Sequence, residues 1–291
     1  MTPGVLVTIA EPRPASTVVL LRPSATRFDV FLVRRSDSIA FMGGAHVFPG
    51  GRVDAADRVD GTRVAIDGAE AAAARMPDVA AEDAVAHHVA ALRELFEEGG
   101  VLLARRNDRI ITIDGDSAAR IAVHRHNLLA GTTSFADIVR AEGVRLALDE
   151  LTYFAHWVTP EVEIKRFDTR FFVARAPEGQ TPVHDQGETI HSEWLDPLDA
   201  IARSRNEEIA LPPPTWTTLS TLAKFDSIEA VVEWARRKPI PRVQPGFLTR
   251  GDETLLLYPG DPLYPPLEGF DTPEETRFAL KNRRWRPVRP D

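Results

Sequence analysis

The chain has 291 residues, 43% hydrophobic and 27% charged, which is ordinary for a globular protein and long enough for one large or two smaller domains. A formal net charge of −8 disfavours nonspecific nucleic-acid binding, and the lack of cysteine excludes disulfides and zinc–thiolate sites. No signal peptide or apolar run of membrane-spanning length is visible, so we expect a cytoplasmic protein without membrane contacts.

The first predicted elements are two β-strands, at residues 16–23 and 28–36, because both segments are rich in Val, Leu and Phe and a short turn joins them. A glycine-punctuated loop follows at residues 41–57. Its Gly50 and Gly51 permit a backbone conformation or a close approach that other residues resist. This loop is therefore a place where the backbone can approach a ligand or another segment.

A helix is predicted at residues 81–98, where apolar side chains follow helical spacing. Gly99 and Gly100 supply its C-terminal stop. The alanine-rich stretch before it, residues 58–76, lacks strong periodicity and is interpreted as an insertion that is partly helical.

The middle of the chain alternates between helical and strand-like patterns. The predicted elements are helices at 116–131 and 134–143, strands at 151–159 and 165–176, and a strand that runs into a helix near Pro197. Strands mixed with helices in this way indicate an α/β fold.

The last quarter begins with two predicted helices, at residues 211–225 and 227–237. A hairpin follows at 246–258, turning at Gly251 and Asp252. The remaining tail is basic and rich in proline, and its pattern predicts no element.

Three carboxylates gather at the end of the helix predicted at 81–98. Glu94, Glu97 and Glu98 have the spacing that places side chains on one helical face. Like charges at this spacing destabilise a helix, and the helix dipole disfavours anions at its C-terminus. A divalent cation would reverse both effects, and oxygen ligands of this kind suit Mg²⁺ or Mn²⁺. The alternative is a solvated acidic helix end in which Arg93 pairs with Glu97.

The order of these residues carries a family resemblance. The segment "RELFEEGGV" follows the pattern Arg-Glu-aliphatic-x-Glu-Glu-x-Gly-aliphatic, and it resembles the second half of the Nudix box. "FPGGRVD" resembles the glycine that begins the box, with roughly 28 extra residues between the halves. Val85 stands where counting back from Arg93 predicts the glutamate of the box, so Glu82 or Asp83 is a candidate replacement.

Longer segments resemble one branch of the Nudix hydrolases, the acyl-coenzyme A diphosphatases that include the mammalian peroxisomal enzyme. They are "FMGGAHVFPGGRVDAADR", "VAALRELFEEGGVLLARR", "RFDTRFFVA", "LPPPTW" and "PGDPLYP", and the resemblance spans about residues 18–264. It implies a Nudix-type α/β/α sandwich with a mixed sheet. It also implies a core at 1–208, with an insertion at about 55–80, and a C-terminal helical and hairpin extension at 209–291 that packs on the core.

The same resemblance implies roles for particular residues. The expected metal ligands are Glu94, Glu97, Glu98 and the carbonyl of Gly51. Arg93 is expected to orient a neighbouring glutamate, and the general base is expected to be Glu94, Glu98 or Glu188. The candidate substrate contacts are Arg35, His46, Gly50, Gly51 and Arg166.

The leading functional hypothesis is metal-dependent hydrolysis of coenzyme A or acyl-coenzyme A, giving (acyl-)phosphopantetheine and adenosine 3′,5′-bisphosphate. One alternative is the same chemistry on ADP-ribose, NADH or another nucleoside diphosphate derivative. Another is a domain that senses nucleotides without cleaving them, although three intact glutamates argue against it. The expected partner is a small nucleotide, and the resemblance allows a homodimer because many Nudix enzymes are dimers.

Overall fold

The computed structural model describes residues 9–38, 42–59, 64–185, 187–282 and 284–290. Parts of the predicted glycine loop (residue 41), of the predicted insertion (residues 60–63) and of the tail (residues 283 and 291) lie outside the described residues. Within the described chain, the largest sheet has the strand order β11-β2-β1-β10-β9-β12. Two short strands also belong to it, because β3 pairs with β2 and β4 pairs with β1. The bounds of its strands are β1 (Arg13–Pro23), β2 (Phe28–Arg35), β3 (His46–Val47), β4 (Gly50–Arg52), β9 (Thr152–Val158), β10 (Phe167–Arg175), β11 (Thr189–Leu195) and β12 (Arg242–Val243).

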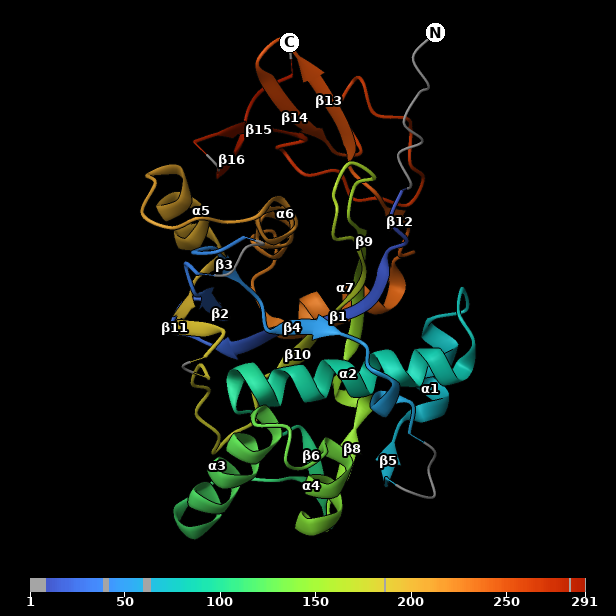
Figure 1. The fold of residues 1–291 in the computed structure, drawn as a ribbon, viewed down its shortest axis with the longest axis vertical. Coiled ribbons are helices and arrows are strands. Elements are labelled where there is room, and N and C mark those ends of the chain that lie inside the picture. The colour runs from blue at the N-terminus through green and yellow to red at the C-terminus, as the bar shows by residue number, and fades with distance from the viewer. Residues whose placement is uncertain (1–8, 39–41, 60–63, 186, 283, 291) are drawn as a thin grey trace, which may run out of the picture.

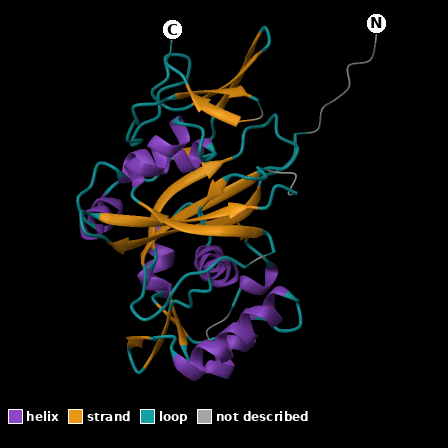
Figure 2. Cartoon of the chain, turned by 90° about the vertical axis from the view of Figure 1, so that its left-hand side faces the viewer, coloured by secondary structure: helices purple, strands orange, loops and turns teal. Residues whose placement is uncertain are grey.

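This sheet is mixed, because β1 runs parallel to β10 and β9 parallel to β12, while the other neighbours are antiparallel. Helices cover both of its faces (Figure 2). Alternating side chains of β1 face opposite ways: Val18 joins the hydrophobic cluster of α2 (Ala81–Gly99), and Val19 joins that of α6 (Pro213–Leu222) and α7 (Ile228–Arg237). The predicted α/β sandwich with a mixed sheet is therefore confirmed.

A second, smaller sheet, of order β5-β8-β6-β7, lies beyond α2 at the lower end of the molecule in Figure 1. Its strands are short, and helices from the middle of the chain accompany it. The elements of this region are η1 (Ala55–Asp57), β5 (Ile66–Asp67), α1 (Ala69–Arg75), β6 (Ala104–Arg106), β7 (Arg109–Ile110), α3 (Gly115–Leu129), α4 (Phe135–Glu142), β8 (Arg145–Ala147) and η2 (Leu148–Glu150).

The C-terminal part begins after α5 (Pro197–Arg205) and ends in a third sheet. The predicted hairpin forms β13 (Gly246–Arg250) and β14 (Glu253–Leu257), with Gly251 at a positive φ of 59°. The tail, for which the sequence predicted no element, adds β15 (Arg277–Lys281) and β16 (Arg284–Pro287). Tyr258 and Phe278 of this part belong to the same buried cluster as Trp157 of β9.

The helix α2 agrees with its predicted bounds, and Gly100 ends it at a positive φ of 70°. Two histidines lie on its buried side. His87 Nδ1 is 3.0 Å from Ser16 Oγ, and His88 Nδ1 donates to the carbonyl oxygen of Ala84 at 2.7 Å. Burial lowers the pKa of both rings to about 4, so both are neutral near pH 7 and pack the helix on the sheet. Among the described residues, no helix combines the length and apolar character that crossing a membrane requires.

Acid should destabilise the fold through these histidines. The pKa of His88 is about 4 in the folded chain and 6.5 ordinarily, so the unfolded chain binds more protons between these pH values. The free energy of unfolding should therefore fall as the pH falls from 6.5 to 4. His88→Gln keeps a donor for Ala84 and should make this fall shallower in urea denaturation. His126→Gln, on an exposed part of α3, is the control, and an equal slope in wild type and His88→Gln would contradict the expectation.

Candidate active site

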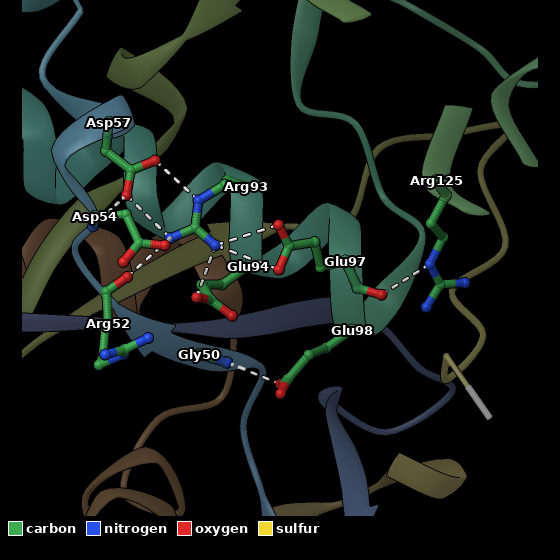
Figure 3. Close-up of polar contacts among 9 residues, drawn as sticks. All are labelled: Gly50, Arg52, Asp54, Asp57, Arg93, Glu94, Glu97, Glu98 and Arg125. Carbon is green, nitrogen blue, oxygen red and sulfur yellow. Dashed lines mark hydrogen bonds and ion pairs between the residues drawn. The ribbon is translucent and has the colours of Figure 1, made fainter. Parts of the chain in front are cut away.

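The glycine loop and the end of α2, far apart in sequence, lie against each other. The strand β4 pairs with β1, which places Gly50 and Gly51 beside the helix. The amide of Gly50 donates to Glu98 Oε2 at 3.0 Å, and a Cβ atom on Gly51 would overlap the carboxylate of Glu94. A side chain at this position would therefore displace the Glu94 carboxylate from where it lies. The two halves of the sequence motif thus form one site (Figure 3).

Arg93 lies at the centre of this site. Its Nη1 donates to Glu94 Oε1 at 2.8 Å and to Glu97 Oε1 at 3.2 Å, and its Nη2 donates to the carbonyl oxygen of Arg52 at 2.8 Å. Its exposed fraction is only 7%. Burial alone would lower its pKa, but the hydrogen bonds of Asp57 and the charges of Glu94 and Glu97 outweigh burial and raise it. Arg93 is a buried, permanently charged group that orients two of the glutamates.

Asp57 is a site residue that the sequence reasoning missed. Its two oxygens accept from Arg93 Nε at 2.8 Å and Nη2 at 2.9 Å, and it is 1% exposed. The proposed replacements for the box glutamate were therefore wrong: Glu82 is exposed, and Asp83 pairs with Arg58 at 2.7 Å. Counting forward from Gly51 instead of back from Arg93 would have found Asp57, because the extra residues follow it.

The surroundings of the three glutamates disfavour their charged forms and raise their pKa values. Burial raises the pKa of Glu94 to about 7, and burial with the nearby Glu94 raises that of Glu98 well above 4.5. The pKa of Glu97 is also raised, first by burial, although Arg93 opposes the shift. Without a further positive charge, these carboxylates tend to take up protons.

The donor set suits a hard divalent cation, because it consists of carboxylate oxygens beside glycine backbone. As the side chains are placed, no group of three or more His, Asp or Glu residues in the described chain is arranged to hold an ion. Figure 3 shows the reason: Glu94 and Glu97 turn toward Arg93, and Glu98 turns toward Gly50. Rotation of Glu94 and Glu97 away from Arg93 would free both carboxylates for a cation.

A cavity of about 600 Å³ opens over this cluster. That volume is typical of small-molecule sites. Of the predicted residues, those that line it are Arg35, Gly50, Gly51, Arg93, Glu94, Glu97, Glu98 and Glu188. The buried Nε of Arg35 has no hydrogen-bond partner in the described chain, and the side chain of Glu188 is exposed.

Two predicted substrate contacts are not among the cavity-lining residues. His46 is buried, lies 3.3 Å from Glu193, and has a pKa lowered by burial to about 4, so it is neutral at pH 7. Arg166 is also buried and donates to the carbonyls of Ala10 and Thr159 and to Gln244. The structure thus gives both residues buried packing and bridging positions outside the cavity lining, and their predicted substrate contacts stay predictions.

Two further residues support the site and carried no motif signal. The Nε of Arg125 on α3 donates to the carbonyl oxygen of Glu97 at 2.8 Å, so it places a cation at the C-terminal end of α2. Asp185 accepts from the amides of Glu188 at 3.1 Å and Thr189 at 2.8 Å, which fixes the loop that carries Glu188.

Comparison with known proteins decides the family. The model of the NUDT19 Nudix domain matches residues 63–222, more than half of the chain. The chain belongs to the NUDT19 Nudix domain family. It is a Nudix diphosphatase, an enzyme that hydrolyses a phosphoric anhydride.

Named relatives and a solved structure agree with this family. The human protein "Acyl-coenzyme A diphosphatase NUDT19" is 30% identical over 281 residues, covering 83% of this chain and 74% of the relative. The chicken (Gallus gallus) protein of the same name is 27% identical, covering 82% and 73%. The crystal structure of a NUDIX hydrolase from Alicyclobacillus acidocaldarius has a TM-score of 0.65 at 25% identity and covers 78% of this chain and 97% of its own.

The role of Asp57 in this Nudix site can be tested through stability. Asp57→Asn would leave Arg93 charged, buried and short of its main partner, which typically costs about 3–5 kcal/mol of unfolding free energy. Asp54→Asn is the matched control, because Asp54 is half exposed and lies 3.9 Å from Arg93. Urea denaturation of both variants measures the difference. Equal stabilities would show that Asp57 does not hold Arg93.

Proposed function

We propose that this Nudix enzyme hydrolyses the diphosphate of coenzyme A or acyl-coenzyme A, giving (acyl-)phosphopantetheine and adenosine 3′,5′-bisphosphate. The observation that carries the proposal is the cluster of Glu94, Glu97 and Glu98 beside Gly50 and Gly51 at one cavity. The names of the human and chicken relatives support the substrate class.

The proposal includes Mg²⁺ or Mn²⁺ held by Glu94, Glu97, Glu98 and the carbonyl of Gly51. Bound there, such cations would neutralise phosphate charge and lower the pKa of a water. Nudix hydrolases generally use divalent ions, and the raised pKa values of these glutamates fit a site that is completed by positive charge. Arg93 keeps its bonds to Asp57 and so stays in place when the glutamates turn to a cation.

Glu188 is the general base in this proposal. It lines the cavity, it is exposed, and its carboxylate makes no hydrogen bond within the described chain, so its oxygens are available to accept a proton from water. The glutamates of α2, in contrast, bond to Arg93 or to the amide of Gly50. Asp185 positions the backbone of Glu188 through its amide.

Product analysis tests the function. Purified protein with Mg²⁺ or Mn²⁺ would receive coenzyme A, an acyl-coenzyme A, ADP-ribose and NADH in parallel, with separation of products by mass-resolved chromatography. Faster release of adenosine 3′,5′-bisphosphate from the coenzyme A compounds than of AMP from the others is the expected result. Faster AMP release would indicate that ADP-ribose or NADH, and not a coenzyme A compound, is the preferred substrate. Metal-dependent binding of all four compounds without cleavage would indicate a nucleotide sensor.

Neutralising two of the glutamates separates catalysis from folding. The double variant Glu97→Gln, Glu98→Gln should lose hydrolysis, because amides hold divalent cations far more weakly than carboxylates do. Its free energy of unfolding without metal should equal or exceed that of wild type, because two desolvated like charges are removed. Steady-state rates and urea denaturation measure the two effects. Hydrolysis at the wild-type rate would exclude the proposed metal site.

Removing the proposed base should affect turnover alone. Glu188→Gln should lower kcat by about 10²–10⁴-fold, the usual contribution of a general base, with metal affinity unchanged. Glu178→Gln is the control, because Glu178 is an exposed carboxylate in another loop. Rate measurements with saturating Mn²⁺ and a separate Mn²⁺ titration give both quantities. An unchanged kcat would assign the base role to Glu94 or Glu98.

A further inference from the structure

Lys238 lies outside the active site, in aromatic surroundings. It follows α7, the helix that packs on β9 (Figure 1). The Nζ atom of Lys238 lies 4.0 Å from the ring centroid of Trp234 and 4.9 Å from that of Phe154. The two rings also contact each other, with centroids 5.6 Å apart. The amine is therefore held against two aromatic side chains.

This amine lacks strong polar partners. Within the described chain, Lys238 makes no hydrogen bond and no ion pair. The charge of Asp271 favours the ammonium form of Lys238, but the Oδ2 atom of Asp271 accepts a hydrogen bond from Lys224 Nζ at 3.1 Å. The ring faces attract a cation without replacing the hydrogen bonds of water. Partial burial thus disfavours the charged form of Lys238.

The same surroundings favour the neutral amine. Burial lowers the pKa of Lys238 to about 8, although the charge of Asp271 opposes the shift, and the charge of Lys224 adds to it. At pH 7.5 a pKa of about 8 leaves roughly a quarter of the amines neutral, against about one in a thousand at the ordinary value of 10.5. A neutral lysine amine is a nucleophile, and desolvation beside another cation is a common way of activating one.

The amine can be reached from the surface. A hollow of about 370 Å³ is lined by Ala230, Glu233, Trp234, Arg237 and Lys238. None of these residues lines the cavity of the active site. Arg237 and Glu233 pair with each other, and Lys238 is only partly buried. A small molecule that enters the hollow therefore meets the amine beside the indole ring of Trp234.

Acyl transfer from a thioester fits this nucleophile. The neutral amine would attack the carbonyl carbon, so that a C–N bond forms and the C–S bond breaks. The sulfur leaves as a thiol with the proton that the amine loses. The resulting amide is uncharged and needs no counter-ion, and its acyl group meets the aromatic surface of Trp234 and Phe154.

We propose that Lys238 is a modification site, at which the side-chain amine accepts an acyl group from acyl thioesters. Acyl-coenzyme A compounds belong to this class of donor, but the reaction requires no diphosphate, no metal ion and no residue of the active-site cavity. The inference therefore goes beyond the proposed function and does not depend on it.

The distribution of acetyl groups over the lysines tests the proposal. The lysines of the chain are Lys165, Lys224, Lys238 and Lys281. The full chain would be incubated at the same pH with S-acetyl-N-acetylcysteamine, and peptide mass spectrometry would give the acetylation rate of each lysine. Lys238 should react at least about tenfold faster than the exposed Lys165 and Lys281, because far more of its amine is neutral. A rate at Lys238 that does not exceed those of Lys165 and Lys281 would overturn the proposal.

Lys224→Gln tests the cause of the reactivity on an exposed residue. The substitution removes a neighbouring cation and frees Asp271 to pair with Lys238, so acetylation of Lys238 should become several-fold slower. Lys281→Gln is the matched control and should leave the rate at Lys238 unchanged. An equal rate at Lys238 in wild type and Lys224→Gln would contradict activation by these surroundings. Because the probe contains no diphosphate, failure here is distinguishable from failure of the proposed function.

Discussion

The ion pair between Arg93 and Asp57 is the interaction on which the site depends. Three glutamates at the C-terminal end of a helix repel one another and oppose the helix dipole. Burial makes this arrangement costlier, as the raised pKa values of Glu94 and Glu98 show. Arg93 offsets part of the repulsion from inside the cluster, and Asp57 fixes Arg93 with two hydrogen bonds. The fold can therefore form with the carboxylates close together before any cation binds.

The same ion pair links distant parts of the chain. Arg93 bonds to Asp57 and to the carbonyl of Arg52, both within the glycine loop. Gly50 adds its amide bond to Glu98, and Gly51 gives Glu94 the room that a side chain would remove. Polar contacts thus fix the position of the glycine loop against helix α2. The same helix packs on β1 through apolar side chains of the hydrophobic core. The cavity opens over the polar contacts, and its buried apolar lining, such as Phe171 and Leu256, belongs to the hydrophobic cluster on the other face of the sheet.

The sequence predicted the parts of this molecule that rest on local patterns. The strands β1 and β2, the helix α2 with its glycine stop and the hairpin β13–β14 all follow from short-range periodicity and turn chemistry. The tail was different, because β15 and β16 form by pairing with β14 and each other, and their short, basic, proline-containing sequence carries little signal of its own. The consequence was functional, since Trp285 of β16 lines the cavity.

Within the site, the motif residues were predictable and their supports were not. Glu94, Glu97 and Glu98 share a face by helical spacing alone, whereas Asp57 had to be found across an insertion of unknown position. His46 and Arg166 lie within the segments that carry the family resemblance, but their burial against Glu193 and backbone carbonyls depends on tertiary packing that the sequence pattern does not reveal. Arg125 and Asp185 support the site through hydrogen bonds to backbone groups. Such bonds leave no pattern of side-chain types in the sequence.

An anomalous-scattering measurement on crystals grown with Mn²⁺ would test the central claim most directly. The account predicts a manganese peak among the carboxylates of Glu94, Glu97 and Glu98 and the carbonyl of Gly51. It also predicts that Arg93 keeps both bonds to Asp57 and releases Glu94 or Glu97. A cluster without manganese at a concentration that supports hydrolysis, or a peak elsewhere in the cavity, would contradict the claim that these carboxylates are built to hold a divalent cation.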